Sequence, residues 1–335
     1  MPVGELFILG FFGKTVPAWL REFAGRYGLG GVILFDYSCQ TKQYDNNIES
    51  PEQVQVQRLC EEISRLPSRP MVFIDQEGGL VRRLKDSRGF KPLPSAKEFN
   101  HLALSEKREV LAASFAEMRR LGIHYDFAPV IDVDYNPDNP NIGKIKRSWS
   151  ADIGEVEANA LLVSEVARET GIGLCLKHFP GIGGAVVDSH QEFMDISDSL
   201  RTEQEELFYS LAPQMFGDAV LVSHAIVRQW DARPMTLSAA GIGRLRRRLP
   251  DTLLITDDMQ MQGLQKALGT RQASLQSLKA GIDMLCIGNN LFDQEQEMAA
   301  IAQSVEQSVR EGTLAGSTIE RSIERIRNRK ALLAV

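Results

Sequence analysis

Eight short apolar segments recur along the chain, and longer stretches with the periodicity of amphipathic helices lie between them. Each segment is rich in Val, Ile, Leu and Phe, which is typical of a strand that is buried on both faces. Alternating β and α units predict a parallel sheet, and eight such units in 335 residues are what a (β/α)8 barrel requires. We therefore predict an α/β fold, a TIM barrel that forms one domain over residues 1–335. The segments cover residues 6–11, 31–35, 71–75, 124–132, 173–179, 219–224, 252–258 and 283–288.

The stretches between the strands carry helix start and stop signals. The stretch 50–66 begins with Ser50 as a candidate N-cap and Pro51 at the first helical position. A later stretch ends at Gly122, which is a residue typical of helix C-termini. The alternative fold is an open, doubly wound sheet, but no G-x-G-x-x-G motif follows the first strand. The polar segment 133–150 is predicted to be a functional loop of the barrel.

The composition is that of an ordinary globular protein, with 43% hydrophobic and 24% charged residues. A net charge of −6 gives no reason to expect nucleic acid or an anionic membrane as a partner. No apolar run approaches the ~20 residues that a membrane span needs, and the N-terminal segment lacks the basic region of a signal peptide. The four cysteines form neither a CxxC pair nor a zinc-finger spacing, which favours a reduced compartment. We expect a cytoplasmic monomer.

Polar side chains follow the predicted strands at the ends where a TIM barrel carries its active site. Charged residues are seldom buried unless they are paired, so a set of them at one end of buried strands must face a polar cavity. An internal ion pair is the alternative for any single one, but the recurrence on five strands favours a site. The residues concerned are Asp75, Asp126, Asp132, Lys177, His178, His224, Asp257 and Asp258.

Three kinds of chemistry are compatible with this set. His178, His224 and Asp257 could bind a metal ion, but the sequence has neither an HxH nor an HExxH motif, so we expect no metal and no cofactor. Lys177 could form a Schiff base, as in an aldolase, although its neighbours do not require this. Glycoside hydrolysis is the third, and it needs a nucleophile or base on one side of the sugar and a proton donor on the other.

The sequence offers both groups that glycoside hydrolysis needs. Asp257 at the end of a strand is the candidate nucleophile. In an extended or turn segment, residues i and i+2 face the same way, so Asp188 can accept a hydrogen bond from one ring nitrogen of His190 while the other nitrogen faces the substrate. Such a pair can donate a proton to a leaving group and take one from water. The glycine-rich segment 181–184 is expected to let the loop move this pair over the sugar.

Several motifs together resemble those of glycoside hydrolase family 3. They are "KHFPG" followed by "DSH", "ITDDMQM", "IDQEGGLVRRL", "DFAPVIDV" and "AGIDMLCIG", and the similarity runs from "GELFILGF" to the last helix. Within the family, the chain resembles the single-domain β-N-acetylglucosaminidases of bacterial peptidoglycan recycling. The resemblance implies a TIM barrel and a retaining enzyme that releases terminal N-acetylglucosamine from small muropeptides of the N-acetylglucosaminyl–anhydromuramyl type.

The resemblance also implies roles for single residues. Asp257 matches the family nucleophile, and Asp188 with His190 matches the acid/base dyad of the N-acetylglucosaminidase branch. The positions that match sugar-binding residues of the family are Asp75, Arg83, Arg147, Lys177 and His178.

The sequence departs from the family pattern at two places. Ile182 stands where the family usually has the second histidine of "KHFPGHG". The loop "IGKIKRSW" carries two more residues than the usual "IG-x-R-S-F", so Lys144 or Lys146 could take the role assigned to Arg147.

Two alternatives to a hydrolase remain. A histidine acid/base has no permanent negative charge and would not repel phosphate, so a phosphorylase acting on β-N-acetylglucosaminides or β-glucosides has the same signature. The departures in the loops also leave open a sugar-binding barrel that has lost turnover, because function resides in a site and not in a fold.

Overall fold

The computed structural model describes residues 1–43, 46–48, 53–186 and 193–335. Eight parallel strands follow one another in the order β11-β8-β7-β6-β3-β2-β1-β12. A bridge between Ile255 and Met284 joins the two outer strands of this order, so the sheet is nearly closed. Each predicted segment contains one of these strands, and the predicted TIM barrel is confirmed. The strands are β1 (Phe7–Leu9), β2 (Gly31–Leu34), β3 (Met71–Ile74), β6 (Tyr125–Asp126), β7 (Gly173–Phe179), β8 (Ala219–Val222), β11 (Leu253–Thr256) and β12 (Leu285–Ile287).

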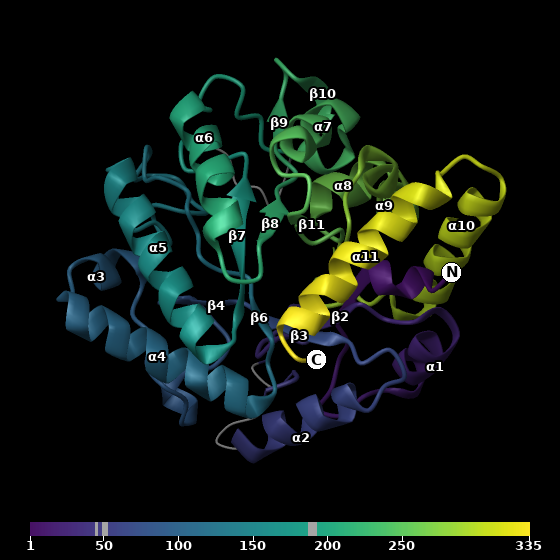
Figure 1. Ribbon diagram of the computed structural model, residues 1–335, viewed down its shortest axis with the longest axis horizontal. Helices are drawn as coiled ribbons and strands as arrows, with labels where there is room; N and C mark the ends of the chain where they lie inside the picture. The colour runs from purple at the N-terminus through teal and green to yellow at the C-terminus, as the bar shows by residue number, and fades with distance from the viewer. Residues whose placement is uncertain (44–45, 49–52, 187–192) are drawn as a thin grey trace.

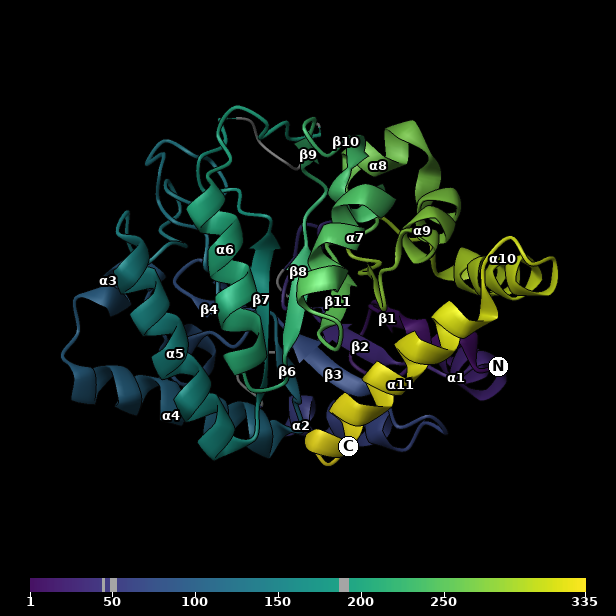
Figure 2. The ribbon, with the colours of Figure 1, turned by 45° about the horizontal axis from the view of Figure 1, so that its top comes forward.

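Helices surround the strands, as Figures 1 and 2 show. The predicted helix end at Gly122 is confirmed, since this residue has φ 89° and caps α4, whereas Ser50 and Pro51 lie outside the described residues. Among the described residues, no helix has the length and apolarity to cross a membrane. The helices are α1 (Ala18–Tyr27), α2 (Gln53–Ser64), α3 (Ala96–Asn100), α4 (Leu104–Leu121), α5 (Ile153–Thr170), α6 (Thr202–Leu211), α7 (Ala239–Arg248), α8 (Gln262–Ala267), α9 (Gly269–Ala280), α10 (Met298–Arg310) and α11 (Gly316–Leu332).

Smaller elements connect these units. Two antiparallel hairpins pair β4 with β5 and β9 with β10. The first hairpin directly follows β3 and extends it over the C-terminal end of the barrel. Their strands are β4 (Gln76–Gly78), β5 (Val81–Arg82), β9 (Ile226–Val227) and β10 (Asp231–Pro234). Single 3-10 turns cover η1 (Val3–Leu6), η2 (Asp86–Arg88), η3 (Ala212–Gln214), η4 (Met235–Leu237) and η5 (Glu295–Glu297).

The fourth barrel strand is much shorter than the segment predicted for it. Only Tyr125 and Asp126 of the segment 124–132 form β6. Pro129 has no N–H to donate to a neighbouring strand, so the ladder beyond Asp126 is irregular: Cys175 donates to the Ala128 carbonyl oxygen at 2.9 Å, and Val130 forms an isolated bridge with Lys177. The chain therefore stays beside β7 as irregular backbone up to Ile131 and then continues into the loop 133–150, which contains no helix or strand.

Aromatic rings fill the interior of the barrel. The ring of Phe73 stacks against those of Tyr125 and Phe127, each at a centroid distance of 5.1 Å. A Cβ added at Gly173 would lie 2.8 Å from the Tyr125 ring, so only glycine fits opposite this tyrosine. The buried Tyr125 hydroxyl donates to the carbonyl oxygen of Gly217 at 2.6 Å. This packing makes a solid floor beneath the C-terminal ends of the strands.

Candidate active site

A cavity of about 1280 Å³, including its mouth, opens at the C-terminal ends of the strands. Its floor is the apolar interior of the barrel, from which Ile33, Phe127 and Leu221 reach the cavity. The charged side chains of its lining come from β3, the β4–β5 hairpin, the 133–150 loop, β7 and the end of β11. They are Asp75, Glu77, Arg83, Arg147, Lys177, Asp257 and Asp258, with His178 beside them. The structure thus brings together all six predicted site residues that lie in its described part.

Lys177 forms the centre of an ion-pair network in this cavity. Its Nζ lies 2.8 Å from Asp75 Oδ1 and 2.5 Å from Glu77 Oε1. Arg83 donates to the other oxygen of Asp75 at 2.9 Å. Burial opposes the ionisation of Asp75, but the charges of Lys177 and Arg83 outweigh it and hold the pKa of this carboxyl below its usual range. Burial also disfavours charge on Lys177, and the two carboxylates nevertheless raise its pKa. Both groups are therefore charged at neutral pH.

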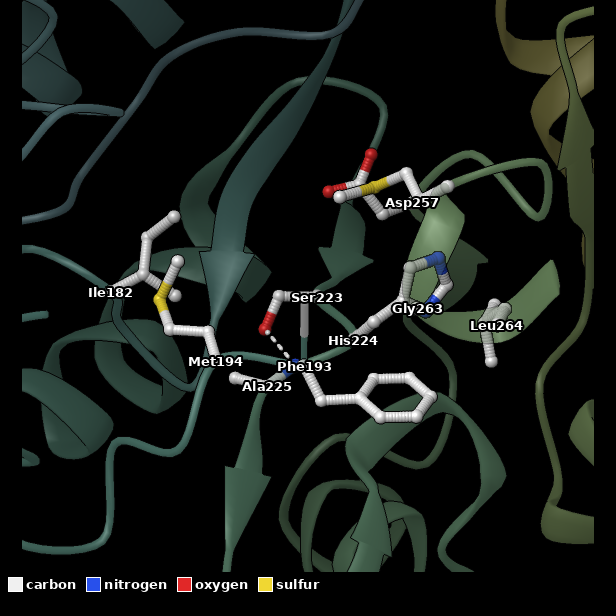
Figure 3. Close-up of a pocket in the computed structure, with 10 residues that line it drawn as sticks. Ile182, Phe193, Met194, Ser223, His224, Ala225, Asp257, Gly263 and Leu264 are labelled. Carbon is white, nitrogen blue, oxygen red and sulfur yellow. Dashed lines mark hydrogen bonds between the residues drawn. The ribbon is translucent and has the colours of Figure 1, made fainter. Parts of the chain in front are cut away.

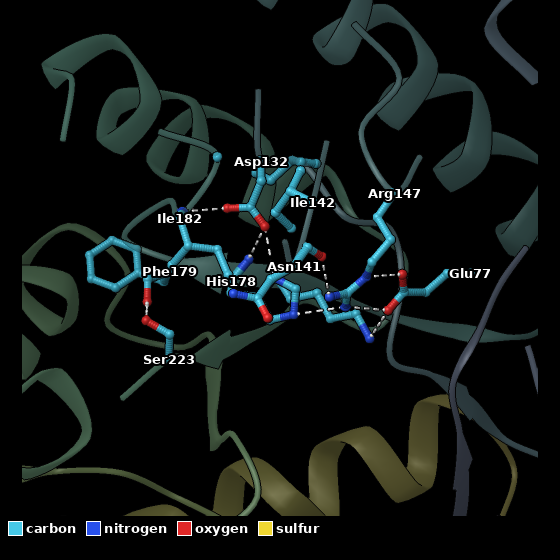
Figure 4. A network of polar contacts seen from close by, with 12 residues as sticks. Glu77, Asp132, Asn141, Ile142, Arg147, His178, Phe179, Ile182 and Ser223 are labelled. Atoms are coloured by element: carbon cyan, nitrogen blue, oxygen red, sulfur yellow. Dashed lines mark hydrogen bonds and ion pairs between the residues drawn. The ribbon is translucent and has the colours of Figure 1, made fainter. Parts of the chain in front are cut away.

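Arg147 is held in the cavity by Glu77, a residue that the sequence analysis did not select. The guanidinium makes two parallel hydrogen bonds of 2.8 Å to the Glu77 carboxylate and a third, at 2.9 Å, to the Asn141 carbonyl oxygen (Figure 4). Burial alone would raise the pKa of Glu77, but Arg147 and Lys177 lower it to about 2. The signal available in the sequence was the "D-x-E" spacing, because Asp75 and Glu77 are two positions apart and reach the same cavity.

The two lysines near Arg147 lie elsewhere. Lys146 is exposed and its Nζ lies 3.4 Å from Glu98 Oε1, and Lys144 is exposed as well. Neither lysine lines the cavity, whereas Arg147 does. The longer loop therefore keeps an arginine in the cavity.

His178 is oriented by Asp132 on one side and contacts Arg147 on the other (Figure 4). Its Nδ1 lies 2.7 Å from Asp132 Oδ2, and its Nε2 lies 3.0 Å from Arg147 Nη2. A guanidinium can only donate, so Nε2 accepts and Nδ1 carries the proton that it gives to Asp132. Asp132 is fully buried, and its second oxygen accepts the backbone N–H of Ile182 at 2.7 Å. Asp132 therefore fixes both the ring of His178 and the start of the following loop.

Asp257 follows β11 and faces both the large cavity and a smaller pocket of about 360 Å³ (Figure 3). Its backbone N–H donates to the Val222 carbonyl oxygen at 2.9 Å, which ties it to the end of β8. The N–H of Asp258 donates to Asp257 Oδ1 at 2.8 Å. Within the described residues, Asp257 Oδ2 receives no hydrogen bond. One oxygen of this carboxylate is thus held and the other is available to a ligand.

The carboxyl group of Asp258 differs from that of Asp257 in its hydrogen-bond partners. Its side chain is partly exposed to the cavity, and the loss of solvation in the cavity wall raises its pKa to about 7. Its Oδ1 accepts the backbone N–H groups of Gln260 and Gly288, at 2.9 and 3.3 Å. Asp258 therefore holds the turn after β11 through Oδ1, while its side chain also lines the large cavity.

Asp188 and His190 lie outside the described residues, in the segment 187–192. The chain on either side of this segment borders the smaller pocket, because Ile182 precedes it, Phe193 follows it, and both line that pocket with Asp257 (Figure 3).

Close packing accounts for two glycines of the loop that leads to this segment. A Cβ at Gly181 would overlap the side chain of Gln204, and one at Gly183 would overlap the carbonyl oxygen of Val133. Gly181 also has φ +118°, which an L-residue rarely adopts. The root of the loop thus needs glycine for steric reasons, independently of any motion.

Within the described residues, no group of three or more His, Cys, Asp or Glu side chains is arranged to hold a metal ion. Cationic partners occupy the carboxylates of Asp75 and Glu77, so their oxygens are already bound by lysine and arginine. The polar groups of the cavity are instead arranged as donors and acceptors for hydroxyl groups, which bind well to ionised, preformed partners.

Comparisons with known proteins agree with this arrangement. Residues 7–328 match the glycosyl hydrolase family 3 N terminal domain. The chain is 31% identical to a β-hexosaminidase of Methylococcus capsulatus over 83% of this chain and 80% of that protein. It is 32% identical to the β-hexosaminidase LpqI of Mycobacterium tuberculosis over 77% of this chain and 67% of that protein.

Solved structures show the same barrel. A family 3 β-N-acetylglucosaminidase from Paenibacillus superposes with a TM-score of 0.87 at 26% identity, over 99% of this chain. The chain spans only 62% of that longer protein. The structure of M. tuberculosis LpqI superposes with a TM-score of 0.81 at 26% identity, over 98% of this chain and 92% of LpqI. By its sequence over nearly its whole length, and by its fold, the chain is a glycoside hydrolase and belongs to glycosyl hydrolase family 3.

Proposed function

We propose that the protein is a retaining β-N-acetylglucosaminidase that removes terminal N-acetylglucosamine from peptidoglycan fragments. One observation carries the proposal: Asp257 presents a free carboxylate oxygen to the same cavity that the paired charges of Asp75, Lys177 and Arg147 line. Such an arrangement suits a sugar whose hydroxyls bind to the charged wall while its anomeric carbon faces Asp257. Relatives that are named β-hexosaminidases support the choice of an N-acetylated sugar.

In the proposed reaction, Asp257 Oδ2 attacks the anomeric carbon and the bond to the leaving oxygen breaks. His190, paired with Asp188, donates a proton to that oxygen. The resulting glycosyl-aspartate is then hydrolysed by a water molecule from which His190 takes a proton. Two displacements restore the original configuration, so the product is the β-anomer. Asp75, Arg83, Arg147, Lys177 and His178 bind the sugar hydroxyls, and residues 1–335 act as one catalytic domain.

The remaining parts of the proposal concern the setting of the enzyme. We infer a muropeptide of the N-acetylglucosaminyl–anhydromuramyl type as substrate, a monomeric state, and the cytoplasm as location. All four cysteines are free thiols, which supports a reducing compartment.

The proposal is tested with aryl β-N-acetylglucosaminide and the matched aryl β-glucoside, with the first-formed anomer followed by NMR. We expect faster hydrolysis of the N-acetylated substrate and initial release of the β-anomer. Initial release of the α-anomer, or a preference for the glucoside, would refute the proposal.

A phosphorylase is the second candidate, and it differs from a hydrolase in that phosphate, not water, accepts the sugar. The same assay with added inorganic phosphate should still yield free N-acetylglucosamine, at an unchanged rate. Formation of the sugar 1-phosphate would instead identify phosphate as the acceptor.

A further inference from the structure

His224 lies directly behind the nucleophile but takes no part in the chemistry proposed above. It follows β8, is 6% exposed, and lines the smaller pocket beside Asp257 (Figure 3). A buried histidine at this place could act as an acid or base, bind a substituent of the sugar, or hold the surrounding chain. Its contacts decide among these roles.

Both ring nitrogens of His224 are engaged within the protein. Nε2 lies 3.0 Å from the carbonyl oxygen of Asp258, and Nδ1 lies 2.7 Å from Thr236 Oγ1. A carbonyl oxygen can only accept, so Nε2 carries the proton and donates it. Nδ1 therefore presents a lone pair, to which the buried hydroxyl of Thr236 donates. The ring is neutral in this arrangement, and burial, which lowers the pKa of His224, agrees with that state.

The hydrogen bond from His224 is one of several that hold Asp258 in place. The carbonyl oxygen of Asp258 is fixed by His224, and its carboxyl group is fixed by the N–H groups of Gln260 and Gly288. With both ends held, the N–H of Asp258 points at Asp257 Oδ1 at 2.8 Å. This bond sets the rotation of the Asp257 carboxylate and leaves Oδ2 toward the cavity.

We propose that His224 is a positioning residue, which through the backbone of Asp258 orients the Asp257 carboxylate so that Oδ2 is the attacking oxygen. This inference rests on the proposed function, in which Asp257 is the nucleophile. His224 is not a general acid, because its only ring proton is given to a carbonyl oxygen and its other nitrogen accepts from Thr236. Thr236 has a supporting role, since its hydroxyl can donate to the unprotonated Nδ1 and so helps to hold the ring in place.

The test compares His224→Leu with His224→Gln. Leucine removes the donor to Asp258, whereas the amide N–H of glutamine reaches about as far as Nε2 and can replace it. For His224→Leu we expect kcat to fall by about tenfold to a hundredfold, as a misplaced reacting group causes. The KM and the inhibition constant of N-acetylglucosamine should stay near their wild-type values, because the charged wall is untouched. His224→Gln should recover most of the lost kcat.

The leaving group separates positioning from proton donation. Misorientation of the nucleophile slows attack on every substrate, so the loss in His224→Leu should be similar for aryl glycosides with good and poor leaving groups. A loss confined to poor leaving groups would make His224 a proton donor and overturn the inference. So would unchanged kcat in His224→Leu, or a glutamine variant as slow as the leucine variant with the same melting temperature.

Two further variants complete the design. Thr236→Val removes the hydroxyl that holds Nδ1, so the ring loses one of its two hydrogen bonds, and a smaller loss of kcat is expected. An unchanged kcat would show that Thr236 does not help to position His224. Asp257→Ala separates the inference from the function on which it rests. If Asp257→Ala keeps its activity, the proposed function fails; if it is inactive while His224→Leu equals the wild type, only the inference fails.

Discussion

At the scale of single residues, Asp257 is distinguished from its neighbour Asp258 by what holds each carboxyl. Asp257 accepts one backbone N–H group on Oδ1, from the next residue, whereas Asp258 accepts two on its Oδ1 and so holds the turn after β11. Replacing Asp257 by alanine should lower kcat on an aryl β-N-acetylglucosaminide by about a thousandfold or more, since the covalent route is removed. Binding of N-acetylglucosamine, measured by calorimetry, should persist. A sugar-binding barrel without turnover would instead show negligible hydrolysis in both proteins.

The loss of activity on replacing His190 should depend on the leaving group of the substrate. A proton donor matters most when the leaving oxygen is a poor leaving group, so His190→Ala should slow alkyl or disaccharide substrates far more than an activated aryl substrate. The measurement is kcat/KM over a series of leaving groups, in the variant and in the wild type. Equal losses across the series would contradict this role.

Arg147 and Lys146 form a matched pair of variants in the same loop. Arg147 is held by Glu77 and faces the cavity, whereas Lys146 is exposed and points to Glu98. We expect Arg147→Ala to weaken inhibition by N-acetylglucosamine by about tenfold to a hundredfold, the value of one or two charge-assisted hydrogen bonds. Lys146→Ala should leave it unchanged. The reverse result would mean that the longer loop presents its lysine to the sugar.

The sequence pointed to Asp75, Lys177, His178 and Asp257 because each lies at or just after the end of a buried strand. Arg83 and Arg147 were indicated only by the resemblance to the family. The sequence did not point to Glu77, which lies on a hairpin beyond β3 and whose partner Arg147 is 70 positions away. It also gave no role to Asp132, since only the folded chain brings this carboxylate next to His178. Partners that are remote in sequence are determined by the geometry of the barrel and leave no local pattern.

At the scale of elements, the strands and helices were predictable because burial on both faces and amphipathic periodicity leave plain signals. β6 was the exception, because Pro129 cannot donate and the ladder beyond Asp126 becomes irregular, although Cys175 still donates to the Ala128 carbonyl oxygen. Asp126, the last residue of β6, is buried. Its Oδ1 accepts the N–H of Gln76 at 2.9 Å, and its Oδ2 has no hydrogen-bond partner in the part of the chain that the structure describes.

Asp126 makes stability depend on pH in a defined direction. Burial is the main cause that raises its pKa to about 8, with Asp75 and Glu77 adding to the shift and Lys177 opposing it. Below the ordinary carboxyl pKa of about 4, Asp126 is protonated in both the folded and the unfolded chain, so it does not lower the free energy of unfolding. As the pH rises from about 4 to about 8, Asp126 ionises only in the unfolded chain, so the free energy of unfolding falls by up to about 1.4 kcal/mol per pH unit.

The variant Asp126→Asn tests this direction. An asparagine cannot ionise, and its amide oxygen can still accept from Gln76. The gain in unfolding free energy over the wild type, from urea denaturation, should therefore be larger near pH 8 than near pH 5. A gain that is equal at both pH values would show that Asp126 is not responsible.

At the scale of the whole molecule, the two ends of the barrel serve different purposes. Ion pairs at the C-terminal ends of the strands line the cavity, whereas those at the N-terminal ends tie helices to strands. Asp283, fully buried before β12, pairs with Arg246 of α7 at 2.6 Å and with Arg325 of α11 at 3.1 Å. It also accepts the backbone N–H of Leu254 at 2.9 Å.

Removing Asp283 should therefore lower stability without changing catalysis. Asp283→Ala leaves two arginines without their buried partner, and a loss of about 3–5 kcal/mol in unfolding free energy is expected. At a temperature where circular dichroism still shows the native state, kcat and KM should equal those of the wild type. Altered KM under these conditions would show that the two ends are coupled.

The central claim, a covalent bond between the sugar and Asp257, is tested most directly by trapping. The protein is incubated with a 5-fluoro N-acetylglucosaminyl fluoride, whose fluorine slows both displacements and whose fluoride leaves readily. Intact-mass spectrometry should then show one added sugar, and peptide mapping should place it on Asp257. A label on another residue, or rapid turnover of the probe through the α-anomer with no labelled protein, would contradict the account.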